Sequence, residues 1–162
     1  HVSVEPGRSV VGPAMVSLYR VGAVKDATLG DGLKRRYIAV DGGMADNIRP
    51  ALYGARYTAT LANRVSDVEP VRSRIVGKHC ESGDVIVWDV DLPSDVHAGD
   101  LLIIPVTGAY GYSMASNYNM LTKPGVIAVE SGQARWIMRP QTIDDLLELD
   151  TGLASLATAN DT

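Results

Sequence analysis

Apolar residues along the chain fall into short runs rich in valine and isoleucine, separated by glycine, proline, aspartate and serine. This pattern is typical of β-strands that are joined by turns. It predicts strands over residues 14–24, 35–40, 57–63, 72–76, 85–90, 101–106, 126–130 and 134–139. The last two flank Ser131, Gly132 and Gln133, a short loop that predicts a β-hairpin.

Two short helices are also predicted, over residues 110–117 and 142–149. In the second, Thr142 can cap the helix start, and Asp144 and Asp145 suit its positive end. Its apolar residues are predicted to form an inner face: Ile143, Leu146, Leu147 and Leu149. From about residue 151 onward small and polar residues dominate, which indicates a disordered tail. The predicted fold class is therefore mainly β, with one or two short helices.

Composition narrows the function classes. The chain has 162 residues, 46% of them hydrophobic, and no apolar run approaches the roughly 18 residues of a membrane span. Its net charge of −4 is spread along the chain without a basic stripe, which argues against nucleic-acid binding. A single cysteine excludes an internal disulfide, and one Cys with three His argues against a metal site. We expect a soluble, cytoplasmic protein.

The first stretch that could carry chemistry is Glu5, Pro6, Gly7 and Arg8. It follows the alternating residues 1–4 and predicts a strand that ends in a tight turn. Gly7 lets the backbone approach a bound anion, and the planar fork of Arg8 suits a phosphate or carboxylate. On these residues alone, a surface turn with a Glu–Arg pair is the simpler interpretation.

A second stretch runs from Asp41 to Tyr53, directly after the predicted strand 35–40. If its end is a helical turn, Arg49 and Tyr53 share one face and present a cation beside a phenol. Pro50 is then tolerated only because it lies near the start of the turn. A connecting loop with an exposed arginine is an equally open alternative.

Polar residues crowd a third stretch, residues 78–84, between two predicted strands. Lys78 and His79 beside Cys80 favour a reactive thiol that donates a proton or acts as a nucleophile. A lone cysteine is more often a small, inert apolar residue, so that interpretation stays open.

The fourth stretch is rich in glycine and tyrosine and follows the predicted strand 101–106. Gly108, Ala109 and Gly111 leave room for a ligand beside Tyr110, whose hydroxyl would face it. Core packing explains each tyrosine taken singly. Seven tyrosines and no phenylalanine, however, are more aromatic hydroxyls than a purely apolar core requires.

Together the four stretches carry a resemblance over about residues 1–150. EPGR at 5–8, DGGM and RPALY between 41 and 53, CESGD at 80–84, and GAYGYSMASNYN at 108–119 occur in this order. They resemble the C-terminal region of the diaminopimelate decarboxylase family, within the ornithine-decarboxylase-like group of pyridoxal phosphate enzymes. Two family positions differ here: Ala45 follows Met44, and Tyr57 stands where a histidine is common.

The resemblance implies a two-domain subunit in a head-to-tail homodimer. An N-terminal α/β barrel would hold pyridoxal 5'-phosphate through a lysine outside this chain. Residues 1–13 would be the end of that barrel, residues 14–150 a β-barrel or sandwich-like C-terminal domain, and residues 151–162 the tail.

By the same resemblance, specific residues take roles in the shared site. Glu5, Pro6, Gly7, Arg8 and Tyr110 would bind the cofactor. Arg8, Arg49, Tyr53, Glu81 and Tyr110 would bind the amino-acid substrate. Cys80 would be the catalytic proton donor, delivered into the neighbouring subunit's site.

The reaction that this implies is the decarboxylation of meso-2,6-diaminopimelate to L-lysine and carbon dioxide, in lysine biosynthesis. Two alternatives stay open at this point. One is a sister decarboxylase that acts on ornithine, arginine or carboxynorspermidine. The other is a non-catalytic β-domain used for binding or dimerisation.

Overall fold

The computed structural model describes residues 1–30 and 32–152 of the chain. These form two compact units, His1–Ala115 and the described part of Ser116–Thr162. Each unit is considered by itself. Strands account for most of the regular structure, so the predicted mainly-β fold class is confirmed. Among the described residues no helix is long and apolar enough to cross a membrane.

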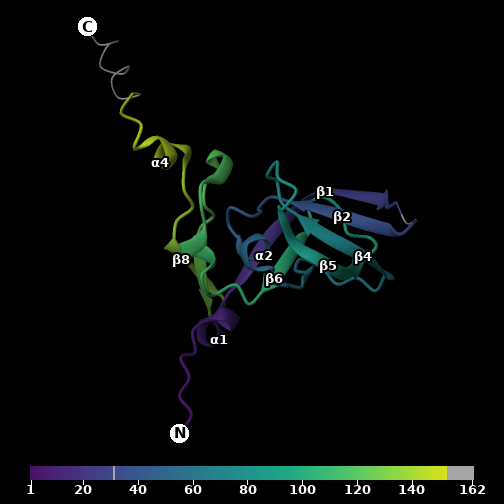
Figure 1. Ribbon diagram of the computed structural model, residues 1–162, viewed down its shortest axis with the longest axis horizontal. Coiled ribbons are helices and arrows are strands. Elements are labelled where there is room, and N and C mark those ends of the chain that lie inside the picture. Colours follow the sequence, from purple (N-terminus) through teal and green to yellow (C-terminus); the bar gives the residue numbers. More distant parts are fainter. Residues whose placement is uncertain (31, 153–162) are drawn as a thin grey trace. The chain divides into compact units, whose positions relative to one another are not determined.

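The first unit is built on one curled sheet, which Figure 1 shows with β1 as its long central strand. Its strands lie in the order β3-β6-β1-β2-β4-β5. They are β1 (Val16–Thr28), β2 (Lys34–Val40), β3 (Thr60–Leu61), β4 (Pro70–Val76), β5 (Val85–Pro93) and β6 (Leu101–Pro105). Short helices lie in the connections: α1 (Arg8–Val11), η1 (Gly12–Ala14), α2 (Arg49–Tyr53) and α3 (Gly111–Met114).

Strand β1 links the two halves of this sheet. Its first part pairs with β6 from Val16 to Arg20, and its second part pairs with β2 from Val21 to Thr28. The register shifts between Val21 and Ala23, at the point where β1 passes from one partner to the other. Alternate side chains of the curled sheet then face a shared core. Its fully buried members include Ile38, Ile75, Ile86, Leu92, Leu102 and Ile104.

Strands β2 and β4 are neighbours and run parallel, whereas the other strand pairs of the sheet are antiparallel. The carboxyl ends of parallel neighbours lie at the same edge of a sheet. The connection that begins at Asp41 and the one that begins at Gly77 therefore leave the sheet side by side. These are the connections that carry the second and third candidate stretches.

The second unit contains η2 (Tyr118–Met120), the hairpin of β7 (Val126–Glu130) and β8 (Gln133–Met138), and α4 (Ile143–Leu147). Glu130 pairs with Gln133, so the hairpin turns on Ser131 and Gly132, whose φ angles are 51° and 75°. Two positive φ angles in succession are typical of the two-residue hairpin turn. The predicted hairpin is confirmed, with a loop one residue shorter than expected.

Each of the predicted strands is present among the described residues, with shifted ends. The predicted cap of α4 is confirmed: Thr142 Oγ1 accepts from Asp145 N at 3.2 Å, and Asp145 Oδ2 accepts from Thr142 N at 2.7 Å. Strand β1 runs on to Thr28, and β3 keeps only Thr60–Leu61 of the predicted 57–63. The predicted helices shorten to α3 and α4.

Two local predictions were wrong. Residues 1–4 have no regular structure, because the described chain brings no partner strand to pair their backbone groups. The apolar face expected on α4 is not an inner face, since Ile143 is 61% exposed and Leu149 is 92% exposed. The boundaries at residues 13 and 150 stay predictions, and residues 153–162 of the expected tail lie outside the described part.

Candidate active site

The connections that follow β2 and β4 are joined by direct hydrogen bonds. Lys78 N donates to Gly42 O at 3.0 Å, and Met44 N donates to Asp84 Oδ1 at 2.7 Å. The first connection leads into α2, which carries Arg49 and Tyr53. The second carries Cys80 and Glu81. The parallel strand pair thus brings two stretches together that lie about 40 residues apart.

Asp84 lies at the centre of this junction. Its other carboxylate oxygen, Oδ2, accepts from His79 N at 2.7 Å and lies 2.9 Å from His79 Nδ1. Both side chains are buried, at 2% exposure for Asp84 and 0% for His79. A Cβ on Gly77 would lie 2.2 Å from Asp84 Oδ2, and a Cβ on Gly43 would lie 2.5 Å from His79 Nδ1. Glycine is therefore needed at both positions for the loops to approach.

A second buried pair supports the turn at residues 41–47. The hydroxyl of Tyr19 on β1 donates to Asp46, whose Oδ1 accepts from Gly43 N at 2.7 Å. Burial raises the pKa of Tyr19 well above its usual value, and the nearby charge of Asp46 adds to this. Burial likewise raises the pKa of Asp46, although the bond from Tyr19 opposes it. The ring of Tyr19 also packs so closely on Gly42 that a Cβ there would lie 2.2 Å from it.

Helix α2 presents its arginine between two aromatic rings. Pro50 stands at its first turn and Gly54 ends it in the left-handed conformation, at φ 61°. The Arg49 guanidinium carbon lies 5.3 Å from the centre of the Tyr53 ring and 5.7 Å from that of Tyr110. The predicted helical turn, with Arg49 and Tyr53 on one face, is confirmed.

The segment around α1, which carries Gly7 and Arg8, lies against the loop that carries Tyr110. A Cβ on Gly7 would come within 2.8 Å of the Tyr110 hydroxyl oxygen, so these two residues are neighbours. Gly108 N donates to Gly12 O at 3.0 Å, which ties the backbones of the two segments together. Arg8 Nη2 donates to Val106 O at 3.4 Å, and its guanidinium carbon lies 5.8 Å from the Tyr57 ring centre.

This loop holds unusual backbone angles. Val106 has a φ of 63° and Tyr110 a φ of 66°. For a β-branched residue such as valine the left-handed region is strained by roughly 1–3 kcal/mol. The hydrogen bonds of Val106 with Arg8 and of Gly108 with Gly12 hold the loop in this strained conformation. The strained residues thus lie where Tyr110 and Arg8 are positioned.

The result is a cluster of two arginines and three tyrosines from separate parts of the chain, which we call the arginine–tyrosine cluster: Arg8, Arg49, Tyr53, Tyr57 and Tyr110. The Nε atoms of both arginines are buried and have no hydrogen-bond partner among the described residues. Neither guanidinium forms an ion pair there. Two planar cations without a carboxylate are suited to bind phosphate or carboxylate groups from a ligand.

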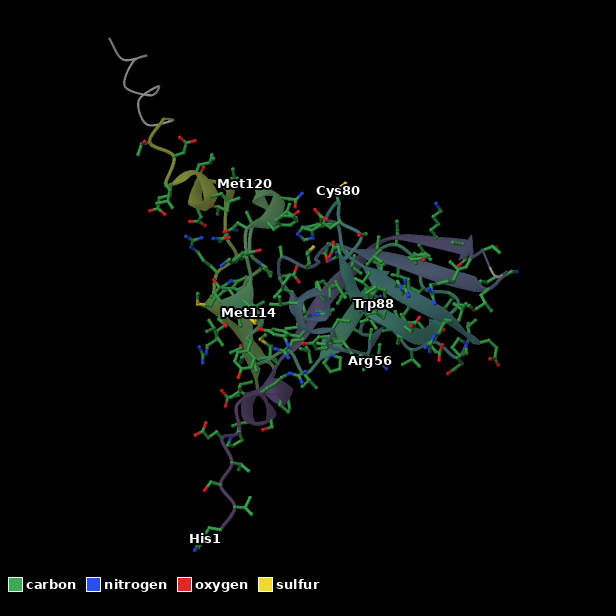
Figure 2. All side chains as sticks on the ribbon, viewed as in Figure 1. His1, Arg56, Cys80, Trp88, Met114 and Met120 are labelled. Carbon is green, nitrogen blue, oxygen red and sulfur yellow. The ribbon has the colours of Figure 1, made fainter. Side chains whose placement is uncertain are left out.

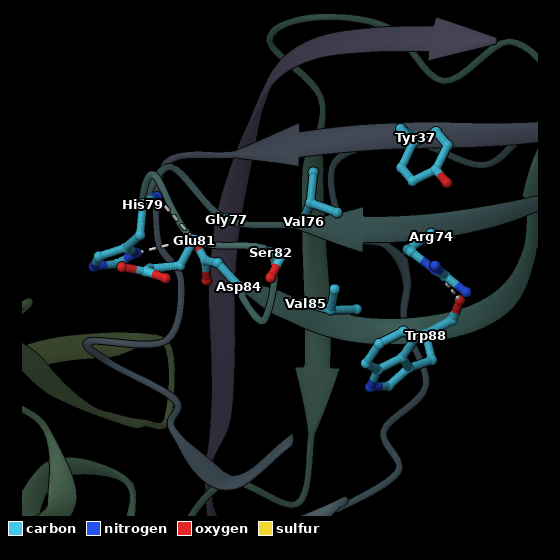
Figure 3. A pocket seen from close by; sticks show the side chains of 10 residues that line it. All are labelled: Tyr37, Arg74, Val76, Gly77, His79, Glu81, Ser82, Asp84, Val85 and Trp88. Atoms are coloured by element: carbon cyan, nitrogen blue, oxygen red, sulfur yellow. Dashed lines mark hydrogen bonds and ion pairs between the residues drawn. The ribbon is translucent and has the colours of Figure 1, made fainter. Parts of the chain in front are cut away.

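Cys80 and Glu81 lie on a different connection from the arginine–tyrosine cluster. Cys80 is exposed at the tip of the loop between β4 and β5, and in Figure 2 it projects away from the sheet. Glu81 is also exposed and lines a cavity of about 350 Å³. Figure 3 shows His79 and Asp84 at the same end of this cavity as Glu81, and Arg74 and Trp88 at the other.

The sheet that positions these residues matches a known family model. Residues 9–108 match the model described as "Pyridoxal-dependent decarboxylase, C-terminal sheet domain". The chain belongs to this family. The match covers the curled sheet, the turn at residues 41–47, α2 and the Cys80 loop, and together with relatives that align over 91% of the chain it confirms the predicted resemblance.

Curated proteins and solved structures that are similar to this chain include diaminopimelate decarboxylases. Diaminopimelate decarboxylase of Mycobacterium tuberculosis is 55% identical over 147 residues, which are 91% of this chain and 33% of that protein. The chain thus spans about a third of the length of the curated relatives it matches. The crystal structure of diaminopimelate decarboxylase from Helicobacter pylori complexed with L-lysine superposes with a TM-score of 0.78 at 34% identity. That superposition covers 91% of this chain and 34% of the other.

A family member with another name is less similar. The crystal structure of the Paramecium bursaria Chlorella virus arginine decarboxylase bound to agmatine has a TM-score of 0.59. It is 25% identical, and the superposition covers 71% of this chain and 30% of that one.

The structure brings together most of the residues predicted from this family's motifs. Gly7, Arg8, Arg49, Tyr53 and Tyr110 are neighbours in the first unit. Sequence reasoning missed two residues. Asp84 lies at the junction of the two connections, and Tyr57 lies in the arginine–tyrosine cluster. Asp84 closes the CESGD motif, so its position was visible although its burial was not. Within residues 1–30 and 32–152 no group of three His, Cys, Asp or Glu residues is placed to hold a metal ion.

Proposed function

We propose that this chain is the C-terminal part of a diaminopimelate decarboxylase. The complete enzyme converts meso-2,6-diaminopimelate to L-lysine and carbon dioxide with pyridoxal 5'-phosphate. The observation that carries this proposal is the 55% identity with diaminopimelate decarboxylase of Mycobacterium tuberculosis across 91% of the chain. The Helicobacter pylori neighbour was solved with L-lysine, the product of the proposed reaction.

The residues at the start of the chain fit the phosphate-bearing cofactor. Glu5, Pro6, Gly7 and Arg8, together with Tyr110, are the residues that would hold it. The buried Nε of Arg8 lacks a partner among the described residues, and Gly7, which has no side chain, lets the backbone lie directly against the Tyr110 hydroxyl. When bound, pyridoxal phosphate supplies the electron sink for the pair left by the departing carboxylate. Its lysine attachment is expected outside this chain.

The substrate carries two carboxylates and two ammonium groups, and the proposed contacts match these charges. Arg49 would pair with the distal carboxylate through its planar fork, and its guanidinium already lies close to two tyrosine rings that would border this contact. Tyr53 and Tyr110 would bound the same space, and Arg8 would reach the substrate from the cofactor side. Glu81 would accept the distal ammonium group.

Cys80 would supply the proton that replaces the carboxylate on carbon. Loss of carbon dioxide leaves an electron pair at that carbon, and the thiol proton forms the new C–H bond. The exposed position of Cys80, on a separate connection from the arginine–tyrosine cluster, supports delivery into the site of a second subunit. A homodimer with shared sites is therefore part of the proposal. Exposed apolar side chains of the hairpin, such as Val129 at 75% and Trp136 at 57%, are consistent with a covered surface in that dimer.

An arginine decarboxylase is the second candidate, because the viral enzyme shares the fold at 25% identity. A substrate without a distal carboxylate would leave the fork of Arg49 without an anion, which costs binding energy. Purified full-length protein assayed with meso-diaminopimelate, arginine and ornithine should release carbon dioxide only from the first. Turnover of arginine or ornithine at a comparable kcat/KM would overturn the assigned substrate.

The role of Cys80 is tested in the same full-length protein. Cys80→Ala should lower kcat by about 10²- to 10⁴-fold, the range expected for loss of a positioned proton donor. The absorbance of bound pyridoxal phosphate should be unchanged, because Cys80 is not among the residues that hold the cofactor. An unchanged kcat would refute the role of this thiol.

A further inference from the structure

Asp84 provides the side-chain link between the two connections, beside the backbone bond from Lys78 N to Gly42 O. Its carboxylate accepts the backbone N–H of Met44 from one connection and that of His79 from the other, each at 2.7 Å. The third contact, 2.9 Å to His79 Nδ1, fixes the buried imidazole. Asp84 itself touches neither the arginine–tyrosine cluster nor Cys80 in these contacts.

We propose that Asp84 is a positioning residue, which holds the loop of Cys80 and Glu81 in place on the first unit by tying it to the turn that leads into α2. The proposal rests on the proposed function, because it acts through the proton donor Cys80. It adds a residue whose part in the reaction is indirect. The structural basis is a single buried carboxylate shared by both connections.

The loop geometry explains how Asp84 acts at a distance of four residues. Gly77 N donates to Asp84 O at 3.0 Å, and Asp84 N donates to Glu81 O at 3.1 Å, so Asp84 closes the loop through its backbone. Its side chain then holds His79, the residue next to Cys80. Cys80 and Glu81 therefore lie at an exposed tip whose two ends are both fixed by Asp84.

Only a carboxylate can serve this junction. Met44 N donates to one carboxylate oxygen and His79 N to the other, so both sides of the group must accept, whereas the amide of asparagine accepts on one side only. In Asp84→Asn, the side that carries the amide NH₂ group would leave one buried backbone N–H without an acceptor, or the side chain would have to rotate. Because Gly43 and Gly77 pack directly on His79 and Asp84, the junction has no free space to absorb such a shift.

Full-length holoenzyme carrying Asp84→Asn provides the first test. Displacement of a proton donor by about 1 Å costs up to about a hundredfold in rate, so kcat for diaminopimelate should fall by about ten- to hundredfold. In a Cys80→Ala background the same substitution should lower kcat by less than about twofold, since the donor it positions is already absent. A purely structural role would lower both backgrounds equally, and that result would overturn the proposal.

Asp91→Asn is the matched control. Asp91 lies on β5, the strand that begins one residue after Asp84, but its side chain is 60% exposed and pairs with Arg72 at 3.4 Å. We expect its kcat to stay within about twofold of wild type. An Asp84→Asn enzyme that is no slower than this control would refute the positioning role.

Hydrogen exchange separates this proposal from the proposed function. In Asp84→Asn, peptides over residues 41–47 and 77–84 should both exchange about tenfold faster, because one carboxylate holds both segments. Faster exchange in residues 77–84 alone would show that Asp84 does not join the connections and would overturn the proposal. This readout needs no turnover, whereas a wild-type enzyme inactive on diaminopimelate would count against the proposed function only.

Gly43→Ala is a second variant for the case in which Asp84→Asn does not fold. It keeps every charge but places a methyl group 2.5 Å from His79 Nδ1 and 2.7 Å from Asp84 Oδ1, which forces the connections apart. The same loss of kcat and the same dependence on Cys80 are expected. Gly30→Ala, where an added Cβ meets nothing within 4 Å, is its control. Equal activity of the two glycine variants would refute the proposal.

Discussion

Replacement of Arg49 by lysine tests whether the planar guanidinium, rather than its charge, binds the substrate. Arg49→Lys keeps one positive charge on a flexible chain but removes the flat surface that lies between Tyr53 and Tyr110. It also replaces a two-pronged donor with a point charge. The position of α2 should be unaffected, because neither Pro50 nor Gly54 is changed.

The size of the effect can be built from these contacts. Two cation–π contacts at partly exposed rings contribute about 0.5–1 kcal/mol each, or about 1–2 kcal/mol together. Loss of the second hydrogen bond to the distal carboxylate adds about 1 kcal/mol. The sum of about 2–3 kcal/mol corresponds to a fall in kcat/KM of about 30- to 150-fold. Because the proposed contact would hold the substrate both before and during the reaction, the change should appear mainly in KM.

The assay is steady-state release of carbon dioxide from meso-diaminopimelate by the full-length enzyme. Arg56→Lys is the control, since Arg56 is exposed and lies three residues beyond α2, and its kcat/KM should change by less than about twofold. If Arg49→Lys behaved like Arg56→Lys, the assigned contact would be wrong. A fall in kcat at constant KM would show that Arg49 acts on the chemical step instead.

Other predictions concern stability and its pH dependence, measured on full-length protein. Arg64→Met should lower the free energy of unfolding by about 3 kcal/mol, because it leaves the buried carboxylate of Asp100 without its two-pronged partner at 2.8 and 2.9 Å. Arg72→Met, which breaks an exposed pair, should cost less than about 1 kcal/mol in the same urea titration. The bonds from Arg64 hold the pKa of Asp100 well below its usual value, so its stabilisation is complete above about pH 4 and lost as the pH falls further. In Asp100→Asn, the fall in the thermal unfolding midpoint between about pH 5 and about pH 3 should therefore be shallower than in wild type. An equal slope would mean that this carboxylate does not couple folding to proton binding.

Much of the fold follows from local sequence pattern. The valine and isoleucine runs predicted every strand of the sheet except β3, and Thr142 predicted the start of α4, because both depend on neighbours a few residues away. Strand ends were less accurate, since the length of β1 is set by its second partner, β2, and not by its own residues. The exposed face of α4 shows the same limit: apolar spacing indicates a face but not what covers it.

Pairing between distant segments could not be predicted from pattern. Nothing in the sequence alone indicates that β2 and β4 run parallel, yet that pairing brings Gly42 and Met44 to Lys78 and Asp84. The contact of Arg8 with Tyr57 depends likewise on the whole course of the sheet. Residue types and motif order gave the list of candidate site residues, which stays a prediction, whereas the grouping of Arg49, Tyr53 and Tyr110 required the tertiary structure.

The parallel pairing of β2 and β4 also places the proposed substrate contact and the proposed proton donor on two separate connections. The hydrogen bonds of the junction end at Asn47, and Arg49, the proposed substrate contact, comes just after it, so the residues of α2 can change without altering the bonds that hold the Cys80 loop. Under the proposed function, a change of amino-acid preference would therefore involve one connection, while the proposed proton donor on the other would keep its place.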